Sequence, residues 1–531
     1  MAGGLVIAIV SHYTAHLFEQ LSQRQFRLLV ISLLLIMVTV QCLLLWAIPL
    51  TIYHDPFRVL DQAVQLAHHH YQWQSTYFWR YPNNVCLTYF LSRWLIVTDK
   101  LGLSVNLSLA ILEIVTLDGL IGLLLLTVHH LSKRRSMVVD ALLFLMVTPF
   151  AYTYYLTVFY SDTLIMLIIM AIIAILIYWP QLTKIKRWLV GSLLLSLTAC
   201  GILIKASLIV IVPAMLLTVL TVQKYRHQLG QLKAPLIAIL VGVAVALPLQ
   251  AIVYRSANFH PNQDYQFPVS AWVSMGLNTH SRGTYSDHDV AKLVQIKHYR
   301  QRSRVANQRL GHRVHRLGIP RILKQVIIKT GILLNGANIG QWYNGGAREA
   351  PAWYQSRLVT ILEIIAVTYQ MALAALYWLV IGRLLHWQGT GSAHHFFVAS
   401  FSVLLALGFL AFYACLWEVE ERYGQVIIPL LLVFLASSKP GNVVSSCRNI
   451  VGRVAATAVL TIIALMSGAA TQLTGSAQTN TLANAKVVAA QRAQLSTTYN
   501  ARPDVIKPRQ IISQEIILNR PAKRVSVQTY P

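Results

Sequence analysis

The chain of 531 residues is 56% hydrophobic and only 12% charged, and its mean hydropathy is +0.55. Long uncharged apolar runs recur from one end to the other, which excludes an ordinary soluble core and predicts an all-α, polytopic membrane protein. The formal net charge of +26 comes from Lys and Arg spread among the segments that flank these runs. It indicates an anionic membrane surface or a phosphate-bearing ligand as partner rather than nucleic acid. The five cysteines show no CxxC spacing, which argues against a disulfide framework or a zinc site.

The apolar runs predict about eleven transmembrane helices. The first run is too long for a signal peptide and no small-residue cleavage site follows it, so we expect it to be retained. In chain order the predicted spans are roughly 26–50, 103–130, 137–157, 162–179, 188–203, 206–222, 234–254, 358–383, 394–416, 424–438 and 450–468. They form one predicted transmembrane domain over residues 1–468, followed by a weakly ordered tail over 469–531.

The run 84–98 decides the predicted orientation, because it is apolar but carries Arg93. If it does not cross the membrane and the N-terminus is cytoplasmic, the basic clusters at 133–135, 184–187 and 224–226 all face the cytoplasm. We therefore expect 84–98 to be an interfacial helix within a first external loop of about 51–102. This count predicts a multi-pass protein of the cell membrane whose active face is extracytoplasmic.

The long external loop of about 255–357 is basic and contains a helical pattern over about 288–330. Apolar residues at helical spacing alternate there with Arg and Lys, which is typical of an amphipathic helix or helix pair lying on a membrane. A basic helix that is merely solvated accounts for the same pattern, and the sequence leaves both interpretations open.

The first polar segment after the first span contains an acid among aromatic residues. His54-Asp55-Pro56 stands at its start, and Tyr81 and Asn83 follow further along. A carboxylate in such surroundings can act as a general base or hold a metal. Asp-Pro is also a common helix start, so an N-cap role for Asp55 is the structural alternative.

Three further charged residues fall on the same predicted outer face. Asp162 stands where a span begins, and an N-cap role is again the alternative. Lys205 separates two short apolar runs, where it can snorkel to the headgroups or bind a lipid phosphate. Arg422, beside Tyr423 and four residues after Glu418, has the forked geometry that suits phosphate.

An outward acid, outward cations and aromatic loops suit a sugar whose leaving group is a lipid-linked phosphate. The cations would stabilise the departing phosphate as its charge develops, and the acid would deprotonate the acceptor. The spans would hold the polyprenyl chain.

The order of these motifs resembles the GT-C superfamily of integral membrane glycosyltransferases. Its members use polyprenyl-phosphate or -pyrophosphate sugars on the outer or lumenal face. The pattern is similar to that of the protein O-mannosyltransferases and the lipid A aminoarabinose transferases, and one loop motif resembles Gram-positive members. In chain order the motifs are His54-Asp55-Pro56, Tyr81-Pro82-Asn83-Asn84-Val85, Phe159-Tyr160-Ser161-Asp162, Trp272 to Asn278 with Gly283-Thr284-Tyr285 and Asp287 or Asp289, and Glu418 with Arg422-Tyr423.

The resemblance implies a GT-C-like fold and a role for each matching residue. Asp55 would be the general base, Asp162 a second carboxylate of the site, and Arg422 a contact to the donor phosphate. The other implied substrate-binding residues are His54, Tyr81, Asn83, Lys205, Glu418 and Tyr423. Metal dependence stays open, with Asp55 and Asp162 as the ligands if a divalent cation is present.

The chain has no WWDYG-like motif, so the resemblance does not extend to glycosylation of asparagine sequons. The acceptor could be a protein hydroxyl or a cell-envelope glycan. A polytopic transporter or flippase for a lipid-linked or anionic substrate is the alternative function. That alternative predicts two halves of similar hydropathy and broken helices near the midplane. The sequence shows neither, and no internal repeat.

Overall fold

The computed structural model describes residues 15–73, 75–222, 230–347, 350–386 and 393–438, together with residue 4. Over these residues every regular element is a helix, and the sole bridge joins Ile52 to Asn344 in antiparallel fashion. The prediction of an all-α protein is therefore confirmed for the described part of the chain. The predicted span 450–468 and the tail 469–531 lie outside the described residues.

Seven described helices are long and apolar enough to cross a membrane. They are α2 (Gln23–Ala47), α6 (Val105–Ser132), α9 (Ser161–Tyr178) with the turn η2 (Trp179–Gln181), α10 (Lys184–Ile204), α12 (Lys233–Ser256), α17 (Leu358–His386) and α18 (Ala393–Ala411) with the π-helical turn η6 (Phe412–Leu416). An eighth span results if the bent pair of α7 (Arg135–Val147) with η1 (Pro149–Ala151) and α8 (Tyr154–Thr157) is counted, although the two parts meet at 61°.

The predicted count of about eleven spans is not confirmed. The segments at 206–222 and 424–438 contain α11 (Ile211–Thr221), preceded by η3 (Ala206–Val210), and α20 (Ile427–Ser437). Both α11 and α20 are 11 residues long, whereas about 20 residues are needed to cross the hydrocarbon core. With η3 included, Ala206–Thr221 is an apolar helical segment that is still shorter than the seven candidate spans.

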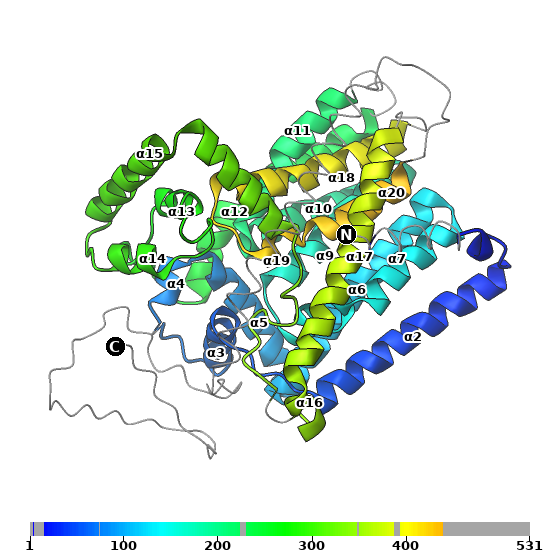
Figure 1. The fold of residues 1–531 in the computed structure, drawn as a ribbon, viewed down its shortest axis with the longest axis horizontal. Coiled ribbons are helices and arrows are strands. Elements are labelled where there is room, and N and C mark those ends of the chain that lie inside the picture. The colour runs from blue at the N-terminus through cyan, green and yellow to red at the C-terminus, as the bar shows by residue number, and fades with distance from the viewer. Residues whose placement is uncertain are drawn as a thin grey trace.

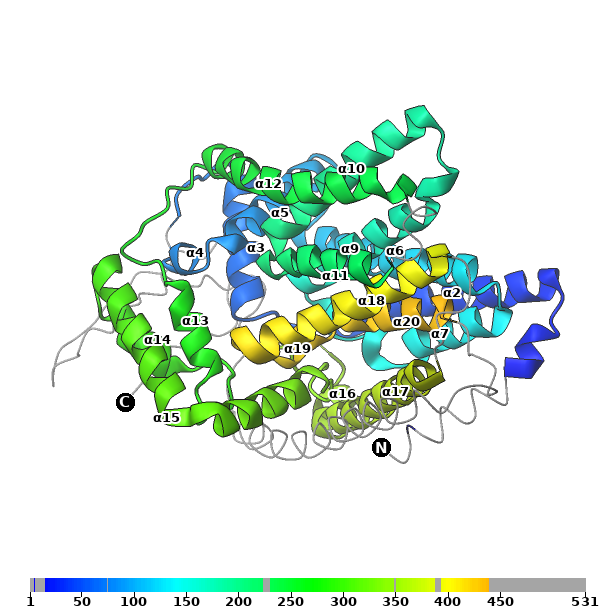
Figure 2. The same ribbon diagram turned by 90° about the horizontal axis from the view of Figure 1, so that it is seen from above.

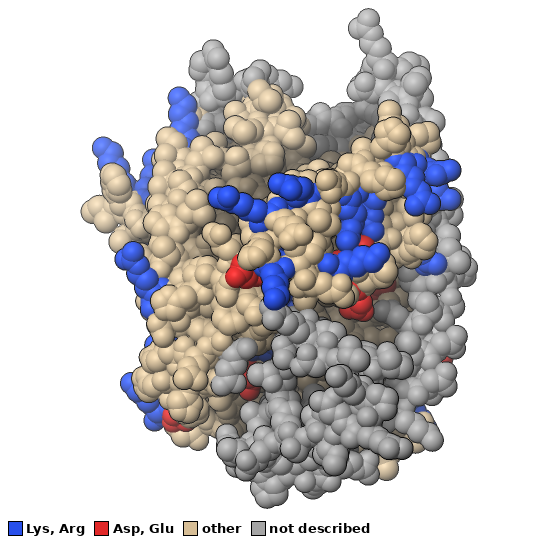
Figure 3. Space-filling view, turned by 90° about the vertical axis from the view of Figure 1, so that its left-hand side faces the viewer, with Lys and Arg blue, Asp and Glu red and all other residues tan. Residues whose placement is uncertain are grey.

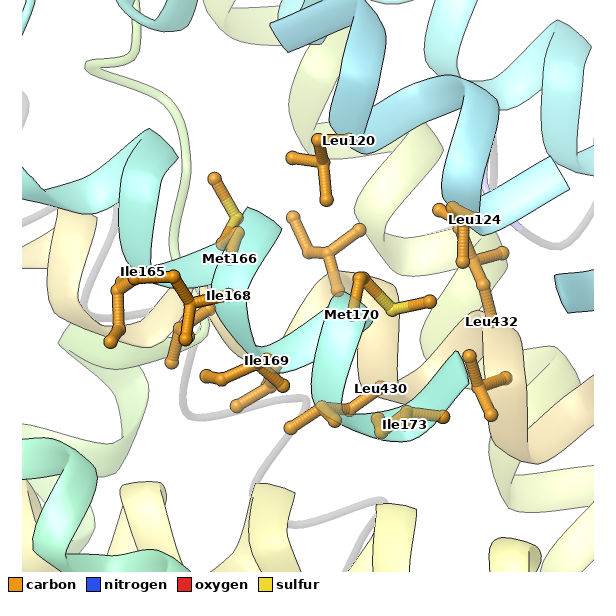
Figure 4. Packing of buried hydrophobic residues seen from close by; sticks show 14 of the residues in the cluster. Leu120, Leu124, Ile165, Met166, Ile168, Ile169, Met170, Ile173, Leu430 and Leu432 are labelled. Carbon is orange, nitrogen blue, oxygen red and sulfur yellow. The ribbon is translucent and has the colours of Figure 1, made fainter. Parts of the chain in front are cut away.

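The central span is α9. Of the residues in its most apolar window 72% are buried, against 11% for α2, which runs along one edge of the molecule (Figure 1). Its sequence is apolar on all sides, as expected for a helix enclosed by others. Ile and Met side chains of α9 pack against Leu120 and Leu124 of α6 and Leu430 and Leu432 of α20 (Figure 4). The first turn of α9 is thereby held by the core of the bundle.

Helices α10 and α12 run in the same direction. Gly242 of α12 lies against Thr198 of α10, and Ala246 packs with Leu203 further along both helices. The chain between them, which includes η3 and α11, therefore has to return along the bundle (Figure 2). This arrangement brings the C-terminal ends of α10 and α12 to one end of the molecule, beside α5 (Asn83–Lys100).

Two helical loops gather at that end. The first loop contains α3 (Asp55–Ala67), α4 (Tyr77–Arg80) and α5, and α5 is not among the seven apolar spans. The second contains α13 (Val269–Gly276), α14 (Asp287–Val294) and α15 (Tyr299–Leu333), which lie together in Figure 1. The predicted helical pattern over 288–330 is confirmed as α14 and α15, and α15 is broken into two halves by the non-helical residue Gly318 (φ +62°).

Short elements complete this end of the molecule. They are α16 (Ala352–Ser356) and α19 (Glu421–Gly424). At the other end of the bundle, the short helix η5 (Gly230–Leu232) precedes α12. The segment after α2 is tied to the loop after α15 by hydrogen bonds from Thr51 N to Gly346 O (2.9 Å) and from Gly345 N to Thr51 O (2.7 Å). These bonds place residues 343–346 close to the start of α3.

Candidate functional site

Asp162 is the centre of a buried cluster of charges. It is the second residue of α9, and its side chain is only 5% exposed. Its Oδ2 accepts hydrogen bonds from the Tyr154 hydroxyl (2.6 Å) and from an Arg422 guanidinium nitrogen (3.0 Å). Its Oδ1 accepts from the Lys205 ammonium. One carboxylate therefore orients two cations.

The structural alternatives for these residues are wrong. The N-cap of α9 is Tyr160, and the Asp162 carboxylate bonds side chains from other elements. Lys205 does not snorkel outward, because its side chain is 13% exposed and points to Asp162. An isolated buried charge is costly, whereas a paired and hydrogen-bonded one is tolerated.

Breaks between helices bring the cluster together. Tyr154 begins α8, Lys205 lies between α10 and η3, and Arg422 lies in α19 between η6 and α20. Each of these polar residues stands at an end of an apolar segment, where the chain leaves regular helix. Because neighbouring segments end at the same level, side chains separated by 43 and 260 positions come into contact.

Aromatic rings surround the Arg422 guanidinium. Its central carbon lies 5.4, 5.0 and 4.6 Å from the ring centroids of Tyr160, Tyr343 and Tyr423. Its Nε also donates to Glu420 (2.6 Å). Cation–π contacts and an ion pair hold a guanidinium in one orientation. Arg422 is therefore fixed in position before any ligand arrives.

Glu418 adds a second buried acid to the cluster. Its Oε1 accepts a hydrogen bond from the Tyr423 hydroxyl (3.0 Å). Its Oε2 is buried and accepts no hydrogen bond from the described residues. Burial, and next the negative charge of Glu420, raise the pKa of the Glu418 carboxyl. Glu418 therefore holds a proton at a higher pH than an exposed glutamate does.

Asp55 lies in a second group of polar residues. The helix α3 begins at Asp55 itself, and its N-cap is His54 at φ +61°, without a side-chain capping bond. The predicted N-cap alternative for Asp55 is therefore wrong. The Asp55 carboxylate instead pairs with Arg58 (2.8 Å) and remains 25% exposed. It is thus fixed in direction yet reachable from outside the protein.

Tyrosines connect the two groups. The Arg58 guanidinium lies 5.1 Å from the Tyr77 ring centroid, and the Tyr77 and Tyr160 hydroxyls are 3.3 Å apart. Burial raises the pKa of the Tyr160 phenol, and the Asp55 carboxylate raises it further. Burial also raises the pKa of Tyr343, and Asp55 adds to that rise. Tyr160 and Tyr343 therefore lie within electrostatic reach of Asp55, and both rings also contact the Arg422 guanidinium.

The remaining predicted residues of the first loop lie around this connection. His54 packs edge-on against Tyr53, with ring centroids 4.2 Å apart, and is within electrostatic reach of Glu420. The Tyr81 ring lies 5.3 Å from that of Trp272 in α13. Asn83 donates to Asn84 Oδ1 (3.2 Å), so it lies next to a residue of the network.

Several residues of the site were not predicted from the sequence, among them Asn84, Tyr77 and Tyr343. Asn84 is buried and donates a hydrogen bond to the Tyr77 hydroxyl. Asn84, rather than the predicted Asn83, is therefore the asparagine that takes part in the hydrogen-bond network of the site. Tyr343 was missed because its loop reaches Arg422 only through the pairing of Ile52 with Asn344. A helical-wheel comparison of Asn83 and Asn84 could have pointed to the second, whereas no local pattern marks Tyr77 or Tyr343.

No metal site is formed by the residues that the structure describes. They contain no group of three or more His, Cys, Asp or Glu side chains placed to hold a metal ion. Both oxygens of Asp162 accept hydrogen bonds from Tyr154, Lys205 and Arg422. A divalent cation would have to displace two positive charges to bind there, so the residues present do not fit one.

An apolar cavity of about 280 Å³ adjoins the cluster. It lies between the end of α2, the bend before α8, the loop after α15, and α17. Its lining includes Ile48, Pro149, Tyr154, Trp342, Ile361 and Ile365. The Tyr154 and Trp342 rings meet edge-on there, 5.3 Å apart. Tyr154 thus lines the cavity with its ring and bonds Asp162 with its hydroxyl.

Comparison with known proteins yields one match. The profile of a family described as "Conserved hypothetical integral membrane protein" matches residues 1–337. The matched part contains Asp55, Asp162 and Lys205, whereas Glu418 and Arg422 lie beyond it. No curated protein and no solved structure matches the chain.

Proposed function

We propose that this chain, which belongs to the family of conserved hypothetical integral membrane proteins, is a glycosyltransferase with a GT-C-like fold. It moves a sugar from a polyprenyl-phosphate donor to an acceptor hydroxyl on the outer face of the cell membrane. The observation that carries the proposal is the cluster in which Asp162 orients Lys205 and Arg422 beside an apolar cavity. About eleven spans with a cytoplasmic N-terminus belong to the same proposal.

The two cations keep hydrogen-bond donors for a phosphate. An Arg has five N–H donors and a Lys three. Three N–H groups of Arg422 donate to Glu420, Asp162 and Tyr423, and one N–H group of Lys205 donates to Asp162. Two donors on each cation have no acceptor among the described residues, and in this proposal they bind phosphate oxygens. Fixed donors of this kind stabilise charge that develops on a leaving group.

The apolar cavity supports a lipid-linked donor. It opens among the ends of α2 and α17, which are two of the candidate spans. Its apolar lining suits the first isoprene units of a polyprenyl chain, because their burial removes apolar surface from water. The Tyr154 hydroxyl at its border would place the phosphate next to Lys205 and Arg422.

Asp55 is the proposed general base. Its carboxylate takes the proton from the acceptor hydroxyl as the oxygen attacks the anomeric carbon of the sugar. The bond from that carbon to the phosphate oxygen breaks, and the lipid phosphate leaves with the electron pair. Lys205 and Arg422 stabilise the negative charge on the phosphate, while Arg58 holds Asp55 in place. No step requires a metal ion.

The role of Asp55 is tested by sugar transfer in membranes loaded with a radiolabelled polyprenyl-phosphate hexose. Asp55→Asn removes the base, and we expect transfer to fall by roughly 10²- to 10⁴-fold. Because this substitution also breaks the pair with Arg58, Arg58→Gln tests the pair alone, and it should lower transfer by less than Asp55→Asn does. Asp61→Asn, which changes another acid of α3, is the matched control and should retain the activity.

Two outcomes contradict the proposal. Equal transfer by the native chain and Asp55→Asn would remove Asp55 from the mechanism. If the native chain transfers no sugar from any of several lipid-linked donors, but moves such lipids across the bilayer, the flippase alternative is correct instead.

A further inference from the structure

The first half of α15 has two basic faces, and the inner one is structural. Arg302 is 2% exposed and donates to main-chain carbonyls of Asp264, Gln266, Leu293 and Ile296. Arg309 and Arg313 pair with the buried Asp289 at 3.4 and 2.8 Å. These arginines hold α13, α14 and α15 together, because each satisfies groups that would otherwise be buried without partners.

The outer face carries basic residues without such a role. Arg300, Arg304, Gln308, His312 and Arg316 follow one another at intervals of four and are all exposed, so they form one stripe along the helix. None of the three arginines pairs with an acid among the described residues. Arg300 and Arg304 are like charges four positions apart, which destabilise a helix rather than support it. Folding alone therefore does not account for the stripe.

The stripe belongs to the end of the molecule that carries the site. Helices α13 to α15 lie together beyond the ends of the spans in both ribbon views (Figures 1 and 2). Seen from that side, Lys and Arg side chains gather on the surface among few Asp or Glu (Figure 3). Lys329, in the second half of α15, bonds Trp417 O, which joins this helix to the segment leading to Arg422.

We propose that the outer stripe of α15 (Arg300, Arg304, His312 and Arg316) binds a polyanionic chain with repeating phosphodiester groups. Four residues advance a helix by about 6 Å, so the stripe from Arg300 to Arg316 is about 24 Å long. That length matches several charged repeats and is far larger than one phosphate group. Arg side chains suit phosphate because their donors bind two oxygens at once.

This polymer is the acceptor of the transferase, an assignment that rests on the proposed function. A long acceptor needs a binding surface outside the reaction site, since only one hydroxyl at a time reaches the base. The stripe supplies it at the same end of the molecule as Asp55 and Arg422.

An anionic membrane surface is the other polyanion that a basic helix can bind, and the stripe does not suit it. A helix lying on a membrane buries an apolar face next to its basic residues. All five positions of the stripe are polar. The most exposed apolar residues of α15, Ile319 and Leu323, come after the break at Gly318, and the first half of the helix exposes one large apolar residue, Val314, which is not part of the stripe.

The test uses the full chain in nanodiscs of neutral lipid and a fluorescent poly(glycerol phosphate) of defined length. The native chain should bind it, and binding should weaken as salt is raised. Arg300→Glu with Arg304→Glu should weaken binding by roughly tenfold or more. Lys184→Glu with Lys186→Glu makes the same charge change at the exposed start of α10 and should leave binding unchanged.

Three results would overturn the proposal: no binding by the native chain, equal binding by the Arg300/Arg304 variant, or quenching of a probe at Gln308→Cys by spin-labelled lipids. The last would place the stripe on the membrane. Asp55→Asn should bind the polymer as the native chain does. Polymer binding without sugar transfer would therefore refute the transferase alone, and transfer without polymer binding would refute only the acceptor surface.

Discussion

Two cations share one buried carboxylate at the residue scale. Lys205 and Arg422 both form ion pairs with Asp162, and Arg422 forms a second ion pair with Glu420. Such a cluster costs desolvation energy, so it is weak evidence for stability and better evidence for a function that needs oriented charges. The raised pKa of Glu418 keeps it from adding another negative charge near neutral pH.

Asp162→Asn should destabilise the protein strongly. The variant leaves Lys205 and Arg422 buried without their shared counter-charge, so we expect the free energy of unfolding to fall by about 3 kcal/mol. Thermal unfolding in detergent, followed by fluorescence-detected size exclusion, measures this. Adding Lys205→Met to Asp162→Asn restores the charge balance and should recover part of the loss. A melting temperature unchanged by Asp162→Asn would show that the ion pairs are not formed.

Glu421 provides a pH-dependent contribution to stability. It accepts hydrogen bonds from the side-chain amides of Asn335 (2.6 Å) and Asn338 (2.8 Å), and burial raises its pKa from 4.5 to about 7. An acid with a higher pKa in the folded state binds its proton more tightly when folded. The free energy of unfolding therefore falls as pH rises from about 4.5 to about 7.

Glu421→Gln removes this titration while keeping the size and polarity of the side chain. The native chain should lose thermal stability between pH 5 and pH 7, in line with the raised pKa, and the variant should lose less over the same interval. Melting curves of both proteins at matched ionic strength make the comparison. Parallel curves for the two would assign the pH dependence to other groups.

The elements place functional residues at their ends. His54 is the N-cap of α3, Tyr160 the N-cap of α9, and Lys205 the C-cap of α10. Apolar residues fill the interiors of the spans, so polar chemistry is left to the breaks between them. Close backbone contacts fix where these breaks lie, as at Gly424, where an added Cβ would lie 1.8 Å from Leu333 O.

Gly424→Ala should therefore disturb the packing of α19 against the end of α15. We expect a loss of about 2–3 kcal/mol in the free energy of unfolding, because the obstructing atom belongs to the main chain and cannot rotate away. Gly122→Ala, in the interior of α6, is the matched control, since nothing lies within 4 Å of the added Cβ. It should be neutral or slightly stabilising. Similar melting temperatures for both variants would contradict the contact.

At the scale of the whole molecule, the charged and polar residues of the site lie at one end of the helix bundle, and two helical loops cover that end. The first loop and the helices α13 to α15 cover the end where Asp55, Asp162 and Arg422 lie (Figure 1). Lys133-Arg134-Arg135 stand at the opposite end of α6 from this cover. From the positive-inside bias we therefore predict that the covered end faces the outside.

Labelling of intact cells tests this orientation. In a chain with its native cysteines replaced, a membrane-impermeant maleimide should label Gln308→Cys on α15 and should not label Lys133→Cys until the membrane is opened. The reverse pattern would invert the topology and place the proposed site in the cytoplasm.

The sequence by itself determined the fold class, the positions of most spans and the helical character of both loops. These depend on local properties, namely apolar run length and the spacing of polar residues. It also selected Asp162, Lys205 and Arg422 as residues of one face, and the structure brings them into contact. The N-cap and snorkelling alternatives considered only the neighbouring sequence. In the structure the side chains of Asp162 and Lys205 instead bond residues of other elements.

Only the tertiary structure decided which side chains meet. The pairing of Asp162 with Lys205 and Arg422 requires the start of α9, the end of α10 and α19 to lie at the same end of the bundle, which no residue pattern shows. Tyr343 reaches Arg422 because residues 51–52 hold its loop. Contacts between distant segments depend on how whole helices pack, and packing is a property of many side chains together rather than of any short motif.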